Sequence, residues 1–372
     1  MSAMTTLSRR RLLAWALAGT TGVPAAHAAA SRDVADVLQR PATIGPRAQA
    51  GMMLAIARAG TRLVAAGERG IVLLSGDHGA TWRQARVPVS VSLTALHFVD
   101  ATHGWAVGHG GAVLSTGDGG ATWTLRLDGL QAARIAQQAA HAQADAPGVS
   151  GEAVRKRVAE ADRLVADGPD KPFLDVRFFD ARRGLVVGAY GLAFATEDGG
   201  QHWTSWMGRL PNPRGNHLYR IATTGRRLFI VGEQGLVLRS DDDGAGFAAV
   251  ETPYAGTWFG AQAERDGGLL VFGLRGNAWA SADGATQWTR LDLGTPNTLV
   301  DAATLADGRM LLVDQSGQGF VDAGPDSGHG FRHLAAGFGV PVSAVVQAAD
   351  GGLVAATPLG LRRIAVPPRI AS

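Results

Sequence analysis

One short motif, Ser/Thr-x-Asp-x-Gly-x-x-Trp, recurs along this 372-residue chain and constrains its fold more than any other feature. Complete copies begin at Ser75, Thr116 and Thr196, and weaker copies begin at Ser240 and Ser281. Each complete copy follows a second signal, which is a small residue, a glycine, two variable residues, a second glycine and an apolar run. A chain that repeats the same pair of signals builds one structural unit many times.

The spacing of the second signal gives the size and number of these units. Its second glycine falls at positions 70, 111, 191, 235, 276, 317 and 360, at intervals of 41, 80, 44, 41, 41 and 43 residues. A period near 41 residues, with short strands between glycine-containing turns, is typical of propeller blades. The seven copies therefore predict an all-β fold, a seven-bladed β-propeller. The 80-residue interval predicts an insertion after the second blade.

Each repeat is expected to form four short strands joined by turns. In the second blade the strands are expected at residues 93–98, 104–107 and 112–116, with a fourth beginning at Trp123. Blades 1 and 2 then occupy residues 49–127, blades 3–7 occupy 173–366, and residues 367–372 form a tail. The last repeat stops after three strands. We therefore expect segment 31–48 to close the ring, with residues 37–47 as the missing outer strand, because open edges invite aggregation.

The insertion, residues 128–172, is expected to be a helical hairpin. Apolar residues recur at helical spacing on both sides of Ala146-Pro147-Gly148, which would break a helix. Two interpretations of the apolar stripe remain open: it packs the helices on each other and on the propeller, or it stays exposed as a docking element. The stripe comprises Leu130, Ile135, Val154, Val158 and Val165.

The aspartates of the first motif are interpreted as structural. Each carboxylate can accept backbone N–H groups across the turn between strands three and four, the following glycine tolerates positive φ, and the tryptophan packs between blades. These residues are therefore not expected to be catalytic acids. They are Asp77, Trp82, Asp118, Trp123, Asp198, Trp203, Asp243, Asp283 and Trp288.

The opposite face is the candidate binding face. In a four-stranded blade the turn between strands two and three lies on the side of the connection to the next blade. The variable residues of the Gly-x-x-Gly turns, the insertion and the 206–217 connection should therefore share one surface. The candidate partner- or ligand-binding residues are Glu68, Arg69, His109, Tyr190, Arg209, Arg214, Glu233, Gln234, Trp258 and Arg275.

The N-terminal residues 1–30 resemble an export signal. Arg9 and Arg10 precede an apolar stretch that is too short to anchor in a membrane, and Ala26-His27-Ala28 is a small-x-small cleavage site. A twin-arginine signal is the preferred interpretation and a Sec signal is the alternative. The mature protein is expected in the periplasm of a Gram-negative bacterium, without a membrane span.

Composition argues against several classes. Lys and Arg number 35 and Asp and Glu 32, and the arginines of the signal account for the difference, so nothing favours nucleic-acid binding. The absence of cysteine excludes disulfides and thiolate chemistry. The histidines show no metal-ligand spacing, and neither a metal nor another cofactor is expected.

The repeat resembles the Asp-box, or bacterial neuraminidase (BNR), repeat. The run from Val107 to Trp123 is similar more narrowly to the photosystem II assembly and stability factor family, and the resemblance extends over residues 50–365. It implies a non-catalytic scaffold that helps to assemble a membrane protein complex. Similar proteins of non-photosynthetic proteobacteria imply an accessory role for an RND-type transporter.

Two alternative functions remain open. A sialidase-like glycoside hydrolase would need a tyrosine nucleophile with a glutamate partner, for which Tyr190 with Glu68 or Glu233 is the candidate set, and Arg69 and Arg275 as anion binders. The third interpretation is a propeller that binds a small ligand.

Overall fold

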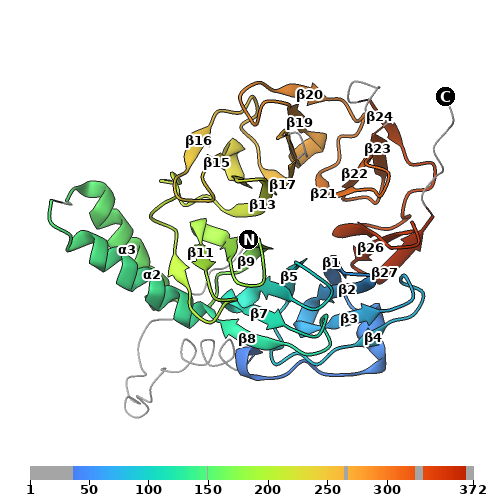
Figure 1. Ribbon diagram of the computed structural model, residues 1–372, viewed down its shortest axis with the longest axis horizontal. Helices are drawn as coiled ribbons and strands as arrows, with labels where there is room; N and C mark the ends of the chain where they lie inside the picture. Colours follow the sequence, from blue (N-terminus) through green and yellow to red (C-terminus); the bar gives the residue numbers. More distant parts are fainter. Residues whose placement is uncertain (1–36, 149, 264–266, 323–329, 366–372) are drawn as a thin grey trace, which may run out of the picture.

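The computed structural model describes residues 37–148, 150–263, 267–322 and 330–365, and these form a ring of antiparallel sheets around a central channel (Figure 1). The prediction of an all-β propeller with seven blades is confirmed. The strands of the first three blades are β1 (Met53–Ala59), β2 (Arg62–Gly67), β3 (Val72–Ser75), β4 (Arg83–Gln84), β5 (Leu93–Phe98), β6 (Gly104–Gly108), β7 (Val113–Thr116), β8 (Thr124–Leu127), β9 (Phe173–Phe178), β10 (Gly184–Gly188), β11 (Ala193–Thr196) and β12 (Thr204–Ser205).

The remaining blades follow the same order, with the first strand of each innermost. In the described part of the chain, six sheets have four strands and the last has three. The strands of blades 4–7 are β13 (Leu218–Thr224), β14 (Arg227–Gly232), β15 (Val237–Ser240), β16 (Ala248–Val250), β17 (Trp258–Ala263), β18 (Leu269–Gly273), β19 (Ala278–Ser281), β20 (Thr289–Leu291), β21 (Leu299–Thr304), β22 (Met310–Asp314), β23 (Gly319–Asp322), β24 (Phe331–His333), β25 (Ala344–Gln347), β26 (Leu353–Thr357) and β27 (Gly360–Ile364).

The hydrophobic core is divided among the junctions between blades. Each cluster of buried side chains combines residues of two adjacent blades, and the cluster that closes the ring joins Met53 and Leu73 of blade 1 to Val354 and Ala356 of blade 7. The middle strands β6, β10 and β18 are buried along their whole length, because both of their faces pack on neighbouring blades. The ring is therefore held together mainly by burial of apolar surface.

The prediction that residues 37–47 form the outer strand of blade 7 is wrong. Residues 37–47 do not pair with β27. They follow the outer side of blade 1 instead, where Ser90 N donates to Val37 O at 2.8 Å and Ala42 N donates to Val87 O at 3.0 Å. Leu38 and Ala42 enter the core between blades 1 and 2. The segment is held there by these hydrogen bonds and by the burial of Leu38 and Ala42.

Closure of the ring instead involves a short 3-10 helix, η1 (Pro46–Ala50), which contacts β27. A Cβ on the second glycine of blade 1, Gly70, would lie 2.1 Å from Val89 O in the connection to blade 2. In blade 7, a Cβ on Gly360 would lie 2.2 Å from Gln49 O, an atom of η1. The N-terminal segment therefore occupies, at blade 7, the place that the connection to the next blade occupies elsewhere.

The insertion is a helical hairpin, α2 (Gly129–Ala144) and α3 (Glu152–Asp167), which projects from the ring beside β8 and β11 (Figure 1). Asp128 begins α2 with a capping box, since its side chain accepts from Gln131 N and the Gln131 side chain accepts from Asp128 N. The apolar stripe is covered in part: Val154 is buried and Ile135 packs against the core between blades 2 and 3, whereas Leu130 is 39% exposed. No helix in the described ranges is long and apolar enough to cross a membrane.

Candidate functional site

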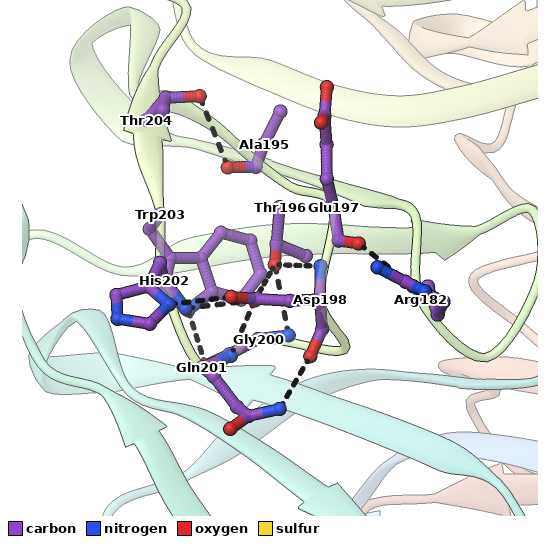
Figure 2. A network of polar contacts seen from close by, with 10 residues as sticks. All are labelled: Arg182, Ala195, Thr196, Glu197, Asp198, Gly200, Gln201, His202, Trp203 and Thr204. Atoms are coloured by element: carbon purple, nitrogen blue, oxygen red, sulfur yellow. Dashed lines mark hydrogen bonds and ion pairs between the residues drawn. The ribbon is translucent and has the colours of Figure 1, made fainter.

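The Asp-box turns form closed hydrogen-bond networks, as Figure 2 shows for blade 3. Thr196 Oγ1 donates to Asp198 Oδ1 at 2.9 Å and accepts from Gly200 N at 2.9 Å. Asp198 Oδ1 also accepts from His202 N at 2.9 Å. Burial raises the pKa of Asp198, but its hydrogen bonds to His202 and Thr196 lower it to about 2. The carboxylate is fully engaged in holding the turn, and it is not poised to transfer a proton.

Equivalent networks hold the turns at Asp77, Asp118 and Asp283. Hydrogen bonds from the side chain and backbone of Thr81 lower the pKa of Asp77 far below its ordinary value. In the box tryptophans of blades 1–3, Nε1 donates to the glycine carbonyl within the same turn, from Trp82, Trp123 and Trp203. Trp288 donates to Glu251 O of the preceding blade instead.

One Asp-box assignment is wrong. Asp242, not Asp243, is the box aspartate of blade 4: it accepts from Ser240 Oγ at 2.7 Å and from Gly246 N at 3.0 Å. Asp243 adopts a left-handed conformation with φ 60° and pairs with Arg226 at 2.8 Å. In a run of three aspartates the correct one is fixed by its distance from Ser240, because the motif requires one residue between the hydroxyl and the carboxylate.

On the opposite face, each Gly-x-x-Gly turn forms a one-turn 3-10 helix: η2 (Glu68–Gly70), η3 (His109–Gly111), η4 (Ala189–Gly191), η5 (Glu233–Gly235) and η6 (Leu274–Gly276). The third residue of the turn has positive φ, and non-glycine residues occupy it at Arg69 (52°), Tyr190 (56°), Gln234 (55°) and Arg275 (58°). All four side chains are exposed, as is His109. This conformation is strained for residues with a Cβ, and strained residues cluster at functional sites, so these turns are candidate contact points.

The two candidate glutamates are half-buried and bind backbone within their own blades. Glu68 Oε1 accepts from Met52 N at 3.2 Å, and Glu233 Oε2 accepts from His217 N at 2.8 Å. The Tyr190 ring lies beside the His217 ring, with 4.8 Å between ring centroids, and Lys171 Nζ lies 5.2 Å from its centroid. No hydrogen bond joins Tyr190 to a glutamate within the described residues.

The 206–217 connection places two candidate arginines on the same face. The guanidinium carbon of Arg209 lies 5.1 Å from the centroid of the Trp206 ring, and Arg214 Nη1 donates to Gln234 Oε1. Both arginines are exposed. Trp258 is a wrong assignment, because it is fully buried between blades 4 and 5, against Tyr254, and cannot contact a partner there.

A groove of about 670 Å³ lies between the hairpin, Tyr190 and the 205–215 connection. Its lining includes small and apolar residues, namely Ala136, Ala139, Ala140, Ala153, Ala161, Met207 and Leu210. Its charged residues are Lys156, Arg157, Arg209 and Glu160. The groove residues of α3 are not among those predicted from the sequence, although basic residues on a helix, with alanines one turn away, are a visible signal.

The central channel holds a second polar cluster that the sequence analysis missed. Arg220 of blade 4 donates from Nη2 to Asp301 Oδ1 of blade 6 at 2.8 Å, and its Nη1 lies 3.9 Å from Asp175 Oδ1 of blade 3. Burial raises the pKa of both aspartates. Burial lowers the pKa of Arg220, but the carboxylates of Asp301 and Asp175 outweigh it and raise the pKa. Charged residues in the innermost strands were the available signal.

This ion pair borders two small cavities. Arg220 and Asp301 line two cavities, of about 200 and 280 Å³, which are smaller than most small-molecule sites. Next to the first cavity, burial and the charge of Arg177 lower the pKa of His97 to about 3, so His97 is neutral at physiological pH. In the described ranges no group of three or more His, Asp or Glu side chains is placed to hold a metal ion.

Comparison with protein families gives one match over most of the chain. The model described as "Photosynthesis system II assembly factor YCF48" matches residues 47–143 and 163–329. A curated relative, "Photosystem II assembly lipoprotein Ycf48" of Synechococcus sp. (strain CC9902), is 37% identical over 71 residues. That stretch covers 19% of this chain and 21% of the relative, so the match spans about a fifth of the relative's length.

Solved structures share the fold at low sequence identity. "YCF48 bound to D1 peptide" has a TM-score of 0.61 and 12% identity, with 88% of this chain and 97% of that chain covered. "YCF48 from Cyanidioschyzon merolae" has a TM-score of 0.59 and 13% identity, with 88% and 98% covered. A streptogramin B lyase has a TM-score of 0.63 and 10% identity, with 88% and 97% covered. The same architecture therefore also carries enzymes.

Proposed function

The chain belongs to the family described as photosynthesis system II assembly factor YCF48, and on that premise we propose that it is a non-catalytic scaffold that helps to assemble a membrane protein complex. We further propose that it is exported to the periplasm, through the twin-arginine route, and that its partner is an envelope protein such as an RND-type transporter. The observation that carries the proposal is the family match together with a surface that gathers exposed residues in strained turns. One relative of known structure was solved with a D1 peptide, which supports a membrane protein as the kind of partner.

The disposition of the titratable groups supports a scaffold over an enzyme. The aspartates of the box turns hold backbone, Glu68 and Glu233 bind their own blades, and the channel carboxylates pair with Arg220. These groups carry structural hydrogen bonds, whereas a catalytic acid needs a pKa near the working pH and access to a substrate. A sialidase-like hydrolase remains the alternative, and a propeller for small ligands is the third candidate.

The proposal can be tested by photo-crosslinking from defined positions. A photoreactive amino acid at Arg214 or Arg275 would sample the Gly-x-x-Gly face, and the same residue at His202, whose side chain is 90% exposed on the Asp-box face, is the matched control. We expect crosslinks to an integral membrane protein from Arg214 and Arg275 in the native envelope, but not from His202. Equal crosslinking from both faces, or crosslinks to soluble proteins alone, would contradict the scaffold.

The same experiment separates the finer alternatives. Identification of a transporter subunit by mass spectrometry supports the RND role, whereas another membrane complex leaves the scaffold intact and removes that role. The hydrolase alternative predicts turnover of a fluorogenic sialoside that Tyr190→Phe abolishes. Turnover of that kind would overturn the non-catalytic proposal.

A further inference from the structure

One side of the groove beside the hairpin comes from a segment that the family model does not match. The family model leaves residues 144–162 unmatched, and these include Ala153, Lys156, Arg157, Glu160 and Ala161, the residues through which α3 lines the groove. A segment that adds a wall to a cleft gives this chain a surface that the shared propeller alone does not have. The groove is therefore the place to look for a binding property of this chain's own.

The groove is held open by contacts on both sides. Lys156 Nζ of α3 donates to Pro213 O of the connection at 2.8 Å, and it lies 3.6 Å from Glu160 Oε1. Across the helices, Gln137 Nε2 and His141 Nε2 both lie 2.9 Å from Asp162 Oδ1. These contacts fix α3 relative to α2 and to the connection, so the cleft between them is preformed and an occupant need not order it.

The charge of the groove is complementary to a carboxylate. Glu160 is engaged by Lys156, which leaves two guanidinium groups, Arg157 and Arg209, to set the charge along the groove. Arg157 Nε is buried and has no hydrogen-bond partner in the described residues. A buried donor without a partner is costly, and because Arg157 lines the groove, a carboxylate bound there would place an acceptor beside this guanidinium. Guanidinium groups are well suited to bidentate pairing with carboxylates.

The shape of the groove fits an extended chain with apolar side chains. Alanines from both helices line the groove, and Met207 and Leu210 line the wall formed by the connection. The volume of about 670 Å³ lies within the roughly 300–1,000 Å³ of ligand-binding clefts. The half-exposed Tyr190, 57% accessible, stands at the rim and offers an aromatic contact of the kind that is enriched in interfaces.

We propose that this groove binds an extended, acidic segment of the partner membrane protein, with apolar side chains against its alanines and carboxylates paired with Arg157 and Arg209. The proposal rests on the scaffold function proposed above and names the chemistry by which the partner is recognised. A free anionic small molecule is the competing occupant, and the test below separates the two.

The test is selection of random peptides displayed on phage against the full chain, with counter-selection against Ala140→Trp, which fills the groove. We expect the groove-dependent clones to be enriched in acidic and apolar residues. The best synthetic peptide should then lose about tenfold or more in affinity for Arg157→Gln, as measured by fluorescence polarisation, because one charge-assisted pair is lost. The same peptide with glutamine in place of its acidic residues should bind the unsubstituted protein as weakly as the original peptide binds the Arg157→Gln variant.

Matched controls keep the result interpretable. Arg163→Gln removes an arginine of the same helix whose side chain is 82% exposed, and Ala166→Trp adds a tryptophan on α3 outside the groove. Both should bind the peptide as the parent does, and all variants should melt like the parent. Selection of clones without acidic bias, the absence of groove-dependent clones, or equal loss in Arg163→Gln would overturn the proposal.

The outcome is independent of the crosslinking experiment. A groove that selects acidic peptides in a protein that crosslinks to no membrane protein would refute the scaffold but not the peptide site. Crosslinking from the Gly-x-x-Gly face with no groove-dependent peptide would refute the site but not the scaffold. A fatty acid and citrate serve as competitors for the groove. If neither displaces the selected peptide, the groove does not hold a small molecule; displacement at micromolar concentrations would show that it does.

Discussion

Replacing Arg220 with methionine should destabilise the propeller strongly, because this side chain connects three blades across the channel. It pairs with Asp301 at 2.8 Å and lies 3.9 Å from Asp175. Asp301 is 8% and Asp175 5% exposed, and each also accepts a backbone N–H of the next blade, from Val345 and Ile221. Methionine keeps the apolar volume but leaves Asp301 without its cation and removes one of the two positive charges, those of Arg220 and Arg177, that act on Asp175.

The expected loss of stability is about 3 kcal/mol at pH 7. Breaking a buried ion pair by removing one partner costs roughly 3–5 kcal/mol, and the lower end applies because the Arg220 side chain is 32% exposed to the channel. The loss should grow with pH. Burial raises the pKa of both aspartates and the charge of Arg220 lowers it, so removing Arg220 raises both pKa values further. A carboxyl group whose folded-state pKa is raised destabilises the fold as the pH rises through the range between its unfolded and folded pKa values, so the variant loses more stability than the parent over that range.

Urea unfolding followed by tryptophan fluorescence would measure the effect at several pH values between about 4 and 8. The triple variant Arg220→Met, Asp175→Asn, Asp301→Asn removes the uncompensated charges and should recover most of the loss. A double-mutant cycle of Arg220→Met with Asp301→Asn gives the coupling energy between Arg220 and Asp301. A single variant as stable as the parent, or a loss that does not change with pH, would refute the argument that Arg220 compensates these carboxylates.

Four further predictions follow from individual contacts. Asp118→Ala should cost about 1 kcal/mol at pH 7 in urea unfolding, because it removes an acceptor of Thr122 and Thr116. Burial raises the pKa of Asp118, but its hydrogen bonds to Thr122 and Thr116 outweigh burial and lower it. Its contribution should therefore be complete above pH ~4 and fade at lower pH, and a difference independent of pH would contradict this. Trp123→Ala should cost about 3–5 kcal/mol, since the ring is only 6% exposed, and a melting curve like the parent's would show that the ring is not structural. Gly360→Ala should speed the hydrogen exchange of residues 46–50, because a Cβ would lie 2.2 Å from Gln49 O. The control is Gly351→Ala, which is also at positive φ but has nothing within 4 Å of the added Cβ. Equal exchange in the two variants would show that the contact at Gly360 is not needed for closure of the ring. Changing Arg9 and Arg10 to lysine should leave a folded precursor in the cytoplasm if the twin-arginine route is used, whereas normal periplasmic yield in a fractionation would favour Sec.

The parts of the fold that the sequence predicts are those encoded within one repeat. The box hydroxyl, aspartate, glycine and tryptophan lie within eight residues of each other, and in blades 1–3 their hydrogen bonds are made within the turn itself. The same locality explains the one error in the boxes. Asp243 was chosen over Asp242 in a run of three aspartates, where only the distance from Ser240 decides which carboxylate closes the network.

The candidate site was predicted in part. The Gly-x-x-Gly turns expose Arg69, Tyr190, Gln234 and Arg275, because a turn of this kind directs its third residue outward in a left-handed conformation. Trp258 could not be judged from the sequence, since the first residue of an inner strand is buried or exposed according to the blade that packs on it.

Only the tertiary structure decided the features that join distant segments. Three such features bring together residues from different repeats. They are the position of η1 against Gly360, the bridge from Arg220 to Asp301, and the groove between α3 and the 205–215 connection. Their local sequences contain ordinary strands, charges and alanines. Turn signals act over a few residues and so can be read in a single chain, whereas these contacts depend on the curvature of the closed ring, which sets the distances between blades.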